Sequence, residues 1–114
     1  MPREIENNAK KMILHVQDTL YVLGGKWRLP IIIAVKHGNS RFKDIKSCIP
    51  KVTSRVLSKE LKELEFNKMI KRTVYDTSPV TIEYTLTDYA TSAREVIVSM
   101  ANWGEKHRKK VKEI

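Results

Sequence analysis

Residues 40 to 86 read SRFKDIKSCIPKVTSRVLSKELKELEFNKMIKRTVYDTSPVTIEYTL, and the order of elements in this stretch decides the fold. Residues 41–48 are predicted to form a short helix, which Ile49-Pro50 ends because proline disfavours the α conformation of the residue before it. A second helix runs from about residue 53 to residue 65, with the hydroxyl of Thr53 or Ser54 available as its N-cap. The side chains expected to face inward from the helices and their turn are Phe42, Ile45, Val52, Val56 or Leu57, Leu61 and Leu64.

Two strands are predicted after the second helix. Residues 69–75 read as one strand, residues 80–86 alternate as the returning strand, and Asp76-Thr77-Ser78-Pro79 supply the turn between them. A hairpin that follows a helix-turn-helix is typical of a winged helix. The sequence therefore predicts a mainly α fold with a small β wing (α+β), in which the second helix is the recognition helix and residues 69–86 are the wing.

Further helices are predicted on both sides of this stretch. Apolar residues spaced by three and four indicate an amphipathic helix over residues 9–23, which Gly24-Gly25 ends. Residues 26–36 are apolar nearly all round and should form the buried centre of the domain. Thr87-Asp88 should cap a long last helix that continues to about Lys110. Its apolar side is formed by Ala93, Val96, Ile97, Met100, Trp103 and Val111.

The first and last helices carry more apolar surface than a small winged core can cover. We therefore expect a homodimer that pairs these flanking helices. Two recognition helices related by a twofold axis would then lie about 34 to 36 Å apart, matching half-sites one DNA turn apart. The expected interface residues are Ile13, Val16, Leu20, Val96, Met100 and Trp103.

The positive charge is concentrated on the predicted reading elements. The chain has 22 Lys+Arg and 13 Asp+Glu, a formal net charge of +9. Residues 36–75 hold 11 of the basic and 4 of the acidic residues, a net of +7, whereas residues 76–114 are neutral overall. This distribution favours double-stranded DNA as the partner.

Length and composition set further limits. The 114 residues are expected to form a single domain, residues 1–114, with room for one core. No stretch has the ~18 to 20 apolar residues that cross a bilayer, and the N-terminus lacks an apolar signal core, so we expect a cytoplasmic protein without a membrane partner. The single cysteine excludes an intramolecular disulfide and a cysteine-based metal cluster. No catalytic pattern is recognisable, and we expect no enzymatic activity, cofactor or metal.

Candidate DNA contacts follow from these elements. Arg55 lies in the first turn of the recognition helix, where a bidentate contact to guanine would give about 1 to 3 kcal/mol of discrimination; an ordinary solvated arginine is the alternative. Arg41 and Lys43 open the preceding helix, whose free N–H groups favour phosphate, although they also suit plain surface. Residues 71–73 alternate on a strand, so only one side of it can face DNA. The full candidate set is Arg41, Lys43, Thr53, Ser54, Arg55, Ser58, Lys59, Lys62, Lys71, Arg72, Thr73, Thr77, Ser78 and Thr81.

Other side chains have a structural and a functional interpretation. Trp27 and Trp103 lie on apolar helix faces, which favours core packing over a ligand wall, although Trp103 also suits a dimer interface. Cys48 is interpreted as a small buried hydrophobe, with a redox role as the alternative. The basic run at residues 106–112 is interpreted as complementing the helix dipole, with contact to DNA as the alternative.

Six segments in fixed order and spacing resemble one protein family. They are Leu23-Gly24-Gly25-Lys26-Trp27, Arg41-Phe42, Ile49-Pro50, Leu61-Lys62-Glu63-Leu64-Glu65, Glu83-Tyr84-Thr85-Leu86-Thr87 and Trp103-Gly104. Together they resemble the HxlR family of bacterial transcriptional regulators, relatives of the MarR type, over about residues 16 to 104. The resemblance implies a homodimeric DNA-binding regulator whose first and last helices form the dimer interface and whose wing tip is the loop around residues 76–81.

The chain departs from the family pattern in two places. Many members carry a cysteine, often followed by proline, before the first family helix, and some use it to sense oxidants or electrophiles; Leu14-His15 stand at those positions here. The wing has Ser78-Pro79-Val80 where Val-Pro-Pro is frequent. The resemblance thus implies the DNA-binding scaffold without that thiol switch, and Cys48→Ser is expected to leave DNA affinity and the response to oxidants nearly unaltered.

These observations favour a transcriptional regulator that binds a pseudo-palindromic operator. Repression is the default because blocking a promoter requires only binding. The alternative is a winged-helix module that binds protein or RNA without a specific operator. The basic recognition face argues against a protein partner, and the lack of a clear aromatic stacking platform argues against RNA. The operator and any small-molecule effector stay unknown from the sequence.

Overall fold

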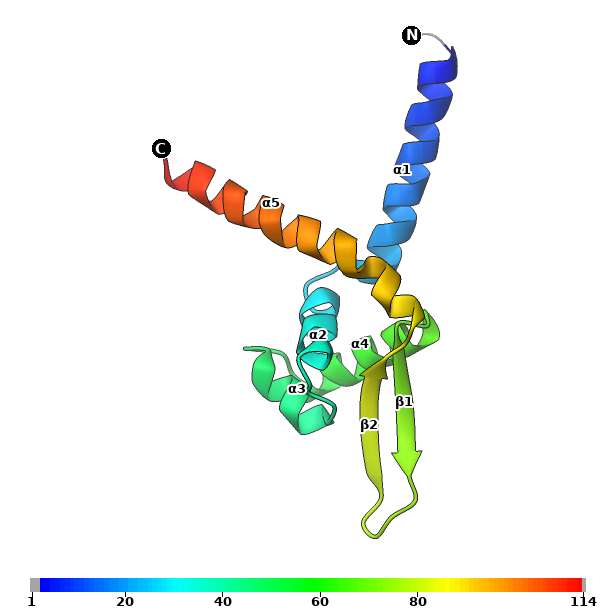
Figure 1. Cartoon of the computed structure of the whole chain (residues 1–114), viewed down its shortest axis with the longest axis vertical. Helices are drawn as coiled ribbons and strands as arrows, with labels where there is room; N and C mark the ends of the chain where they lie inside the picture. Colours follow the sequence, from blue (N-terminus) through cyan, green and yellow to red (C-terminus); the bar gives the residue numbers. More distant parts are fainter. Residues whose placement is uncertain (1–2, 114) are drawn as a thin grey trace.

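The computed structural model describes residues 3–113, apart from the side chains of residues 5 and 6. The elements, in chain order, are α1 (Arg3–Leu23), α2 (Arg28–Lys36), α3 (Phe42–Cys48), α4 (Ser54–Phe66), β1 (Ile70–Tyr75), β2 (Thr81–Leu86), the 3₁₀ helix η1 (Tyr89–Ala93) and α5 (Arg94–Lys112). The predicted mainly α fold with a two-stranded wing is confirmed (Figure 1).

Local signals in the sequence explain where α3 and α4 begin and end. The hydroxyl of Thr53 accepts a hydrogen bond from the backbone N–H of Val56 at 3.2 Å, so Thr53 is the N-cap of α4, as predicted. Ile49, the residue before Pro50, has an extended backbone and ends α3. The helix-turn-helix is therefore specified largely by local chemistry.

Two predicted helix starts differ from the structure by more than two residues. The first helix begins at Arg3 rather than near residue 9. Thr87 does cap the next segment, because its hydroxyl accepts the N–H of Ala90 at 3.1 Å, but that segment is the 3₁₀ helix η1 and the α-helix begins only at Arg94. Residues three apart lie on the same side of a 3₁₀ helix, and this places both Ala90 and Ala93 in the core.

Helix α2 lies at the centre of the core, as its apolar sequence predicts. Ile31 and Ile32 of α2 are buried, and α2 contacts α3, α4 and β2. Ile33 is exposed, so the burial of α2 is not complete on every side. The residues that α3, α4 and β1 bury in this core include Ile45, Leu57, Leu61, Leu64 and Ile70.

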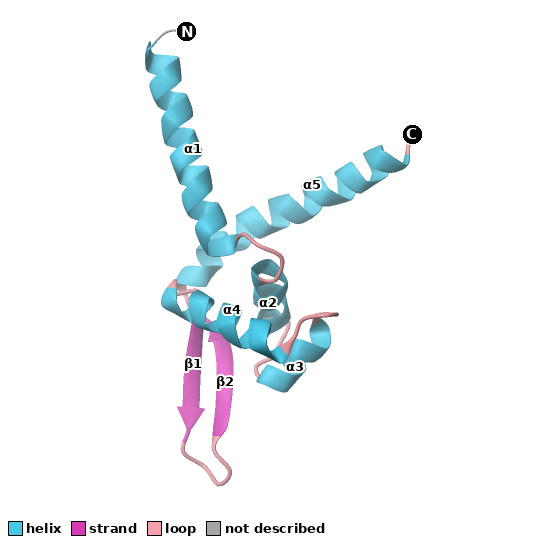
Figure 2. Ribbon diagram, turned by 180° about the vertical axis from the view of Figure 1, so that it is seen from behind, coloured by secondary structure: helices cyan, strands magenta, loops and turns pink. Residues whose placement is uncertain are grey.

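The wing is an antiparallel hairpin attached to the body along one strand. Its register runs from Ile70 opposite Leu86 to Tyr75 opposite Thr81. The backbone N–H of Tyr84 donates to the carbonyl oxygen of Ser40 at 2.7 Å, which ties β2 to the segment just before α3. Figure 2 shows the hairpin projecting from the helical body on the side away from α1.

Helices α1 and α5 extend from the body as two diverging arms (Figure 1). The molecule is consequently elongated, with extents of 65 × 37 × 23 Å. The arm α1 ends at Gly24, where a Cβ atom would lie 2.3 Å from the carbonyl oxygen of Leu20, so only glycine fits there. Gly25 follows with φ of +86°, a conformation that favours glycine.

Two sequence interpretations of single side chains are wrong. Cys48 is exposed rather than buried, because the next residue, Ile49, takes the inward position at the end of α3. Trp103 is 65% exposed rather than part of the core, because among the described residues of α5 only Ile97 packs against the core and the helix then extends from the body. Trp27, by contrast, is half-buried and packs against the core, as expected.

Candidate nucleic-acid interface

The outer face of α4 presents polar and basic side chains to solvent. Ser54, Arg55, Lys59 and Lys62 are exposed, and Ser58 is half-buried at the edge of this face. On the opposite side, Leu57, Leu61 and Leu64 hold α4 in the core. Within the part of the chain that the structure describes, no ion pair engages the three cations of this face. Their charge is therefore available to a partner.

The wing contributes one of its two faces to the same surface. Successive residues of a strand point to opposite sides of the sheet, so Arg72 and Tyr84 share one face. Both line a hollow against α4 together with Ser58, Leu61, Lys62 and Glu65. Lys71 and Thr73 lie on the other face of the hairpin. The structure thus brings Arg72 to α4, the predicted recognition helix, and does not bring Lys71 or Thr73 there.

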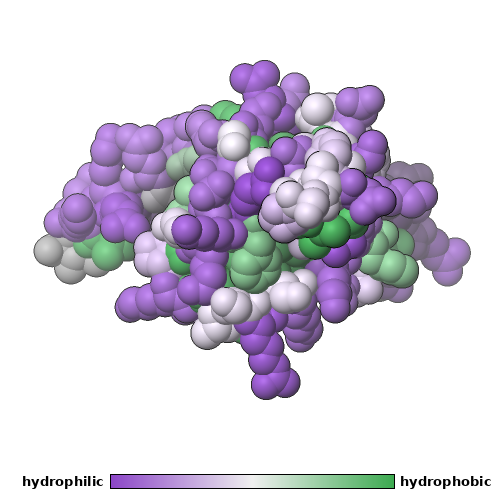
Figure 3. All heavy atoms as spheres, turned by 90° about the horizontal axis from the view of Figure 1, so that it is seen from below, coloured by the Kyte–Doolittle hydropathy of each residue, from purple (hydrophilic) through white to green (hydrophobic). Residues whose placement is uncertain are grey.

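The wing tip is exposed and rich in hydroxyl groups. Thr77 donates from its hydroxyl to the carbonyl oxygen of Pro79 at 2.6 Å, which uses its proton inside the loop. Ser78 is exposed and Thr81 is half-buried at the start of β2. Figure 3 views the molecule from this end, and hydrophilic side chains cover most of the face around a smaller apolar area.

The start of α3 brings further cations beside the wing. Arg41 is the N-cap of α3 and is exposed, as is Lys43. A hydrogen bond with the Glu83 carboxylate raises the pKa of the Tyr75 phenol above its usual value of 10.0, and the charge of Arg41 opposes this effect. The neighbouring Ser40 accepts a hydrogen bond from Tyr84 of β2, so Arg41 lies where the start of α3 meets the wing.

Two exposed cations of the helix-turn-helix, Lys46 in α3 and Lys51 in the turn, are absent from the candidate set predicted from the sequence. Lys51, in the turn between α3 and α4, is exposed and has φ of 71°. Only glycine adopts this left-handed region readily, so a lysine there is unusual. Its position directly after Ile49-Pro50 and before the cap of α4 was visible in the sequence, and that position was the signal to include it.

The expected dimer residues lie on the two arms. The apolar side chains of α1 and α5 that the structure leaves exposed include all six residues predicted for the interface. They are Ile13, Val16 and Leu20 on α1, and Val96, Met100 and Trp103 on α5. Trp103 also stacks on His107 of the same helix, with ring centroids 4.9 Å apart.

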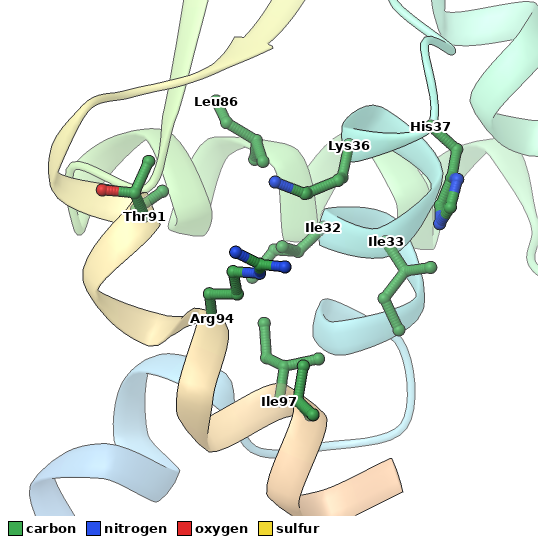
Figure 4. A pocket seen from close by; sticks show the side chains of 10 residues that line it. Ile32, Ile33, Lys36, His37, Leu86, Thr91, Arg94 and Ile97 are labelled. Atoms are coloured by element: carbon green, nitrogen blue, oxygen red, sulfur yellow. The ribbon is translucent and has the colours of Figure 1, made fainter.

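A small apolar hollow lies where α5 joins the body. Ile32, Leu86 and Ile97 line it, and Figure 4 shows Lys36 and Arg94 pointing toward one another across it. Its volume is about 170 Å³, below the roughly 300 to 1,000 Å³ of pockets for drug-sized ligands. The hollow therefore does not by itself indicate an effector.

Other kinds of site find no support in the described part of the chain. Among those residues, no group of three or more His, Cys, Asp or Glu side chains could hold a metal ion. None of the described helices has the length and apolar character needed to cross a membrane.

Comparison with known proteins identifies the family. The sequence model described as HxlR-like helix-turn-helix matches residues 22–112 of the chain. The chain belongs to the HxlR family. Its HxlR-type sequence is 35% identical over 102 residues to the HTH-type transcriptional regulator YtcD of Bacillus subtilis (strain 168), covering 90% of this chain and 81% of YtcD. It is 36% identical over 96 residues to YdeP of the same organism, covering 84% and 75% of the two chains.

Solved structures agree with this assignment. The redox regulator HypR in its reduced form superposes with a TM-score of 0.80 at 32% identity, covering 87% of this chain and 98% of HypR. The crystal structure of YtcD gives 0.77 at 35% identity, covering 82% and 96%. A MarR-family regulator from Enterococcus faecalis V583 gives 0.76 at 26% identity, covering 89% and 92%. The HxlR-family chain is thus a DNA-binding transcriptional regulator of the helix-turn-helix type, related to the MarR regulators.

Proposed function

We propose that the chain is a homodimeric repressor that binds a pseudo-palindromic DNA operator. The observation that carries this proposal is the exposed face of α4, where three cations without ion-pair partners among the described residues lie beside the wing. A helix of this kind enters the major groove and presents the residues of its first turns to base edges. The flanking wing then contacts the backbone or the adjacent minor groove.

Each candidate residue receives a role from its place on this surface. Arg55, with Ser54, Ser58 and Lys59 near the start of α4, would read bases, and Lys62 further along would hold phosphate. Thr53 caps α4 through its hydroxyl oxygen, and the hydroxyl proton of this exposed residue would donate to a phosphate. Arg72 would join α4 at the groove edge. The backbone contacts would come from Arg41 and Lys43 on α3, and from Thr77, Ser78 and Thr81 at the wing tip, while Lys71 and Thr73 would contribute only to DNA that reaches the far face of the wing.

The proposed dimer pairs the two arms. Helix α1 has 21 residues, and none of its described residues before Val22 is even half-buried. A monomer rarely exposes apolar patches this extended, and a helix without tertiary packing is only marginally stable in water. Pairing α1 and α5 with the arms of a second copy buries the apolar side chains of both. The two copies of α4 would then read half-sites about 34 to 36 Å apart.

The remaining functional features also belong to this proposal. The chain would act as one domain in the cytoplasm, and occupancy of a promoter would be sufficient for repression. HypR is a redox regulator, and YodB of Bacillus subtilis is known in a diamide-treated form. This chain has Leu14-His15 where many family members carry the sensing cysteine. Any thiol response would therefore have to pass through Cys48.

The proposal is tested by recovering the operator and titrating it. Genomic fragments retained by the purified chain are sequenced, and the shared site is compared with a scrambled duplex and with single-stranded RNA at several salt concentrations. We expect two chains per duplex by light scattering and specific binding at least about 10³-fold tighter than scrambled binding. Equal affinity for both duplexes, or tighter binding to RNA, would contradict operator recognition, and a monomer at micromolar concentration would contradict the dimer.

A further inference from the structure

The side chain of Arg28 joins three elements. Arg28 is the first residue of α2, and its Nε donates to Oε2 of Glu60 on α4 at 2.6 Å. Its Nη1 donates to the carbonyl oxygens of Tyr21 and Val22, in the last turn of α1, at 2.5 and 3.4 Å. A guanidinium group has five N–H donors in a rigid plane, so it can serve a carboxylate and two carbonyls at once.

The surroundings strengthen this contact. The side chains of Arg28 and Glu60 are only 18% and 16% exposed, unlike the pair Lys109–Glu105 on α5, which is 75% and 69% exposed. Partial burial lowers the local dielectric, and it also means that removing one partner leaves the other charge unpaired. The Arg28–Glu60 pair is therefore a more rigid connection than an ordinary surface ion pair.

The arm α1 has few other attachments that would fix its direction. Among the described residues of α1, only Leu23 is buried and only Val22 is half-buried against the core, and the chain then continues through Gly24-Gly25. Glycines add little stiffness to such a connection. The bonds from Arg28 hold the last turn of α1 at a point where the backbone itself leaves the direction of the arm weakly restrained.

A small change of angle at this point has a large effect at the end of the arm. Twenty-one residues of α-helix are about 32 Å long, and a swing of about 10° displaces the far end by about 5 Å. One base pair corresponds to about 3.4 Å along DNA, since a turn of 10 to 10.5 base pairs spans about 34 to 36 Å. Where the far end of α1 is held against the second copy in the proposed dimer, a swing of that size would move the body and its α4 by about 5 Å, which is more than one base pair.

We propose that Arg28 and Glu60 form a clamp that holds α1 at a set angle to α4 and so sets the half-site spacing that the dimer accepts. This inference rests on the proposed homodimer and its operator binding. Glu60 lies on the flank of α4 that faces α2, whereas Ser58 and Lys62 line the hollow beside the wing. The two residues are thus positioning residues, which act on the DNA contacts through the geometry of the dimer.

The test varies the clamp and the DNA together. Arg28→Lys keeps the charge but loses the fork that reaches α1 and α4 at once, and Glu60→Gln removes the charge on α4. The exchange Arg28→Glu with Glu60→Arg can restore the link between α2 and α4, but a carboxylate cannot donate to the carbonyls of α1. Glu105→Gln, which breaks an exposed pair within α5, is the matched control.

Affinity is measured for duplexes with the recovered spacing, with one or two base pairs added or removed between half-sites, and with a single half-site. We expect the unaltered chain and Glu105→Gln to prefer the recovered spacing by about tenfold or more, and Arg28→Lys and the exchanged pair to lose most of that preference. Affinity for the single half-site should stay within about twofold, which a general loss of folding would not allow. An unchanged spacing preference in Arg28→Lys, or loss of half-site and spaced-site binding in parallel, overturns the clamp.

A second measurement does not involve DNA. Phe66 is 78% exposed at the end of α4, so a spin label at Phe66→Cys in a Cys48→Ser background reports the distance between the two recognition helices. We expect a narrow distance distribution in the unaltered dimer and a broader one with Arg28→Lys. Equal widths overturn the clamp while the proposed function stands. Failure of the unaltered chain to dimerise or to bind DNA overturns both.

Discussion

Arg55 and Arg41 are exposed arginines of the same helix-turn-helix, but they lie in different surroundings. Arg55 is in the first turn of α4, beside Ser54 and Lys59. Arg41 precedes α3 and acts electrostatically on Tyr75 of the wing. A side chain at the end of a recognition helix that enters the groove can reach base edges. A side chain between the supporting helix and the wing can instead contact the DNA phosphate backbone.

Substitution of the two arginines should therefore affect DNA binding in different ways. We expect Arg55→Ala to weaken specific binding by about 1 to 3 kcal/mol and to relax the preference at one base pair. Arg41→Ala should weaken all duplexes similarly and reduce the magnitude of the salt slope by about one unit, as for one lost phosphate contact. Titration of specific and scrambled duplexes over a range of salt concentrations distinguishes the two. If Arg55→Ala lowers the affinity for both duplexes equally, Arg55 contacts the DNA backbone rather than a base. If neither variant lowers the affinity, this face of the protein does not bind DNA.

The exposure of Cys48 changes what is expected of the single thiol. Its predicted burial supported the expectation that Cys48→Ser would leave the oxidant response unaltered. Because Cys48 is exposed, burial no longer supports that expectation. We expect the folded chain to react with a thiol reagent such as Ellman's reagent without denaturant, because access is one of the factors that controls thiol reactivity. The Cys48→Ser variant is the control. A thiol that reacts only after unfolding would contradict the exposed position.

At the scale of elements, the end of α4 contains an unfavourable residue. Lys68 has φ of 64°, and the bonds from Met69 N–H to the Leu64 carbonyl and from Lys68 N–H to the Glu65 carbonyl form a Schellman motif. Glycine is the usual residue at this left-handed position because it lacks a Cβ atom.

Lys68→Gly should consequently raise the free energy of unfolding by about 1 kcal/mol. Lys68→Ala is the matched control, since it removes the same charge but keeps the Cβ atom, and it should bring little gain. Chemical denaturation of the three proteins measures the difference. Equal stabilisation by both variants would assign the effect to the charge rather than to the backbone.

The wing has a pH-sensitive contact between its strands. Glu83 pairs with Thr73 across the hairpin, and Tyr75, two residues further along β1, lies on the same face as Glu83. The hydrogen bond and the charge of Glu83 raise the pKa of the Tyr75 phenol. The folded state thus favours the neutral phenol, so its stabilising effect is present below pH 10 and is lost as the pH rises through the raised pKa.

We expect Glu83→Gln to lower the pKa of Tyr75 and Arg41→Ala to raise it further, since the charge of Arg41 favours the phenolate. NMR titration of the tyrosine rings, with Tyr75→Phe to assign the signal, measures both shifts. A Tyr75 pKa that moves in the same direction in the two variants would contradict this arrangement.

At the scale of the whole molecule, the arms present apolar surface that the body does not cover. Burial of a Leu, Ile, Val or Met side chain contributes about 1.5 to 3 kcal/mol. Leu20→Lys should accordingly weaken the proposed dimer by about tenfold or more, with little effect on the body, because Leu20 is exposed in the single chain.

The matched control for Leu20→Lys is Val80→Lys. Val80 is similarly exposed but lies at the wing, away from the arms, so this change should leave the oligomeric state unaltered. Sedimentation over a range of concentrations gives the dissociation constants. Equal weakening by both changes would indicate an interface at the wing rather than between arms.

The sequence by itself determined the elements whose signals are local. Thr53 provides a cap, Ile49-Pro50 ends a helix, and period-two alternation marks β2, and each of these acts through neighbours within a few residues along the chain. The order of those elements, together with the six family segments, was sufficient for the winged helix-turn-helix and its family. Hydrophobic spacing also placed α2 at the centre of the core, because a helix that is apolar nearly all round is stable mainly where other elements cover it.

Only the tertiary structure decided features that depend on distant residues. Arg28 and Glu60 are 32 positions apart, and neither has a local signal that pairs it with the other. Alternation along β1 showed that Arg72 and Lys71 face opposite ways, but only the packing of the wing against α4 selected Arg72. The exposure of Cys48 and Trp103 depends in the same way on where the chain leaves the body. Periodicity defines a face of an element, whereas burial depends on whether another element covers that face.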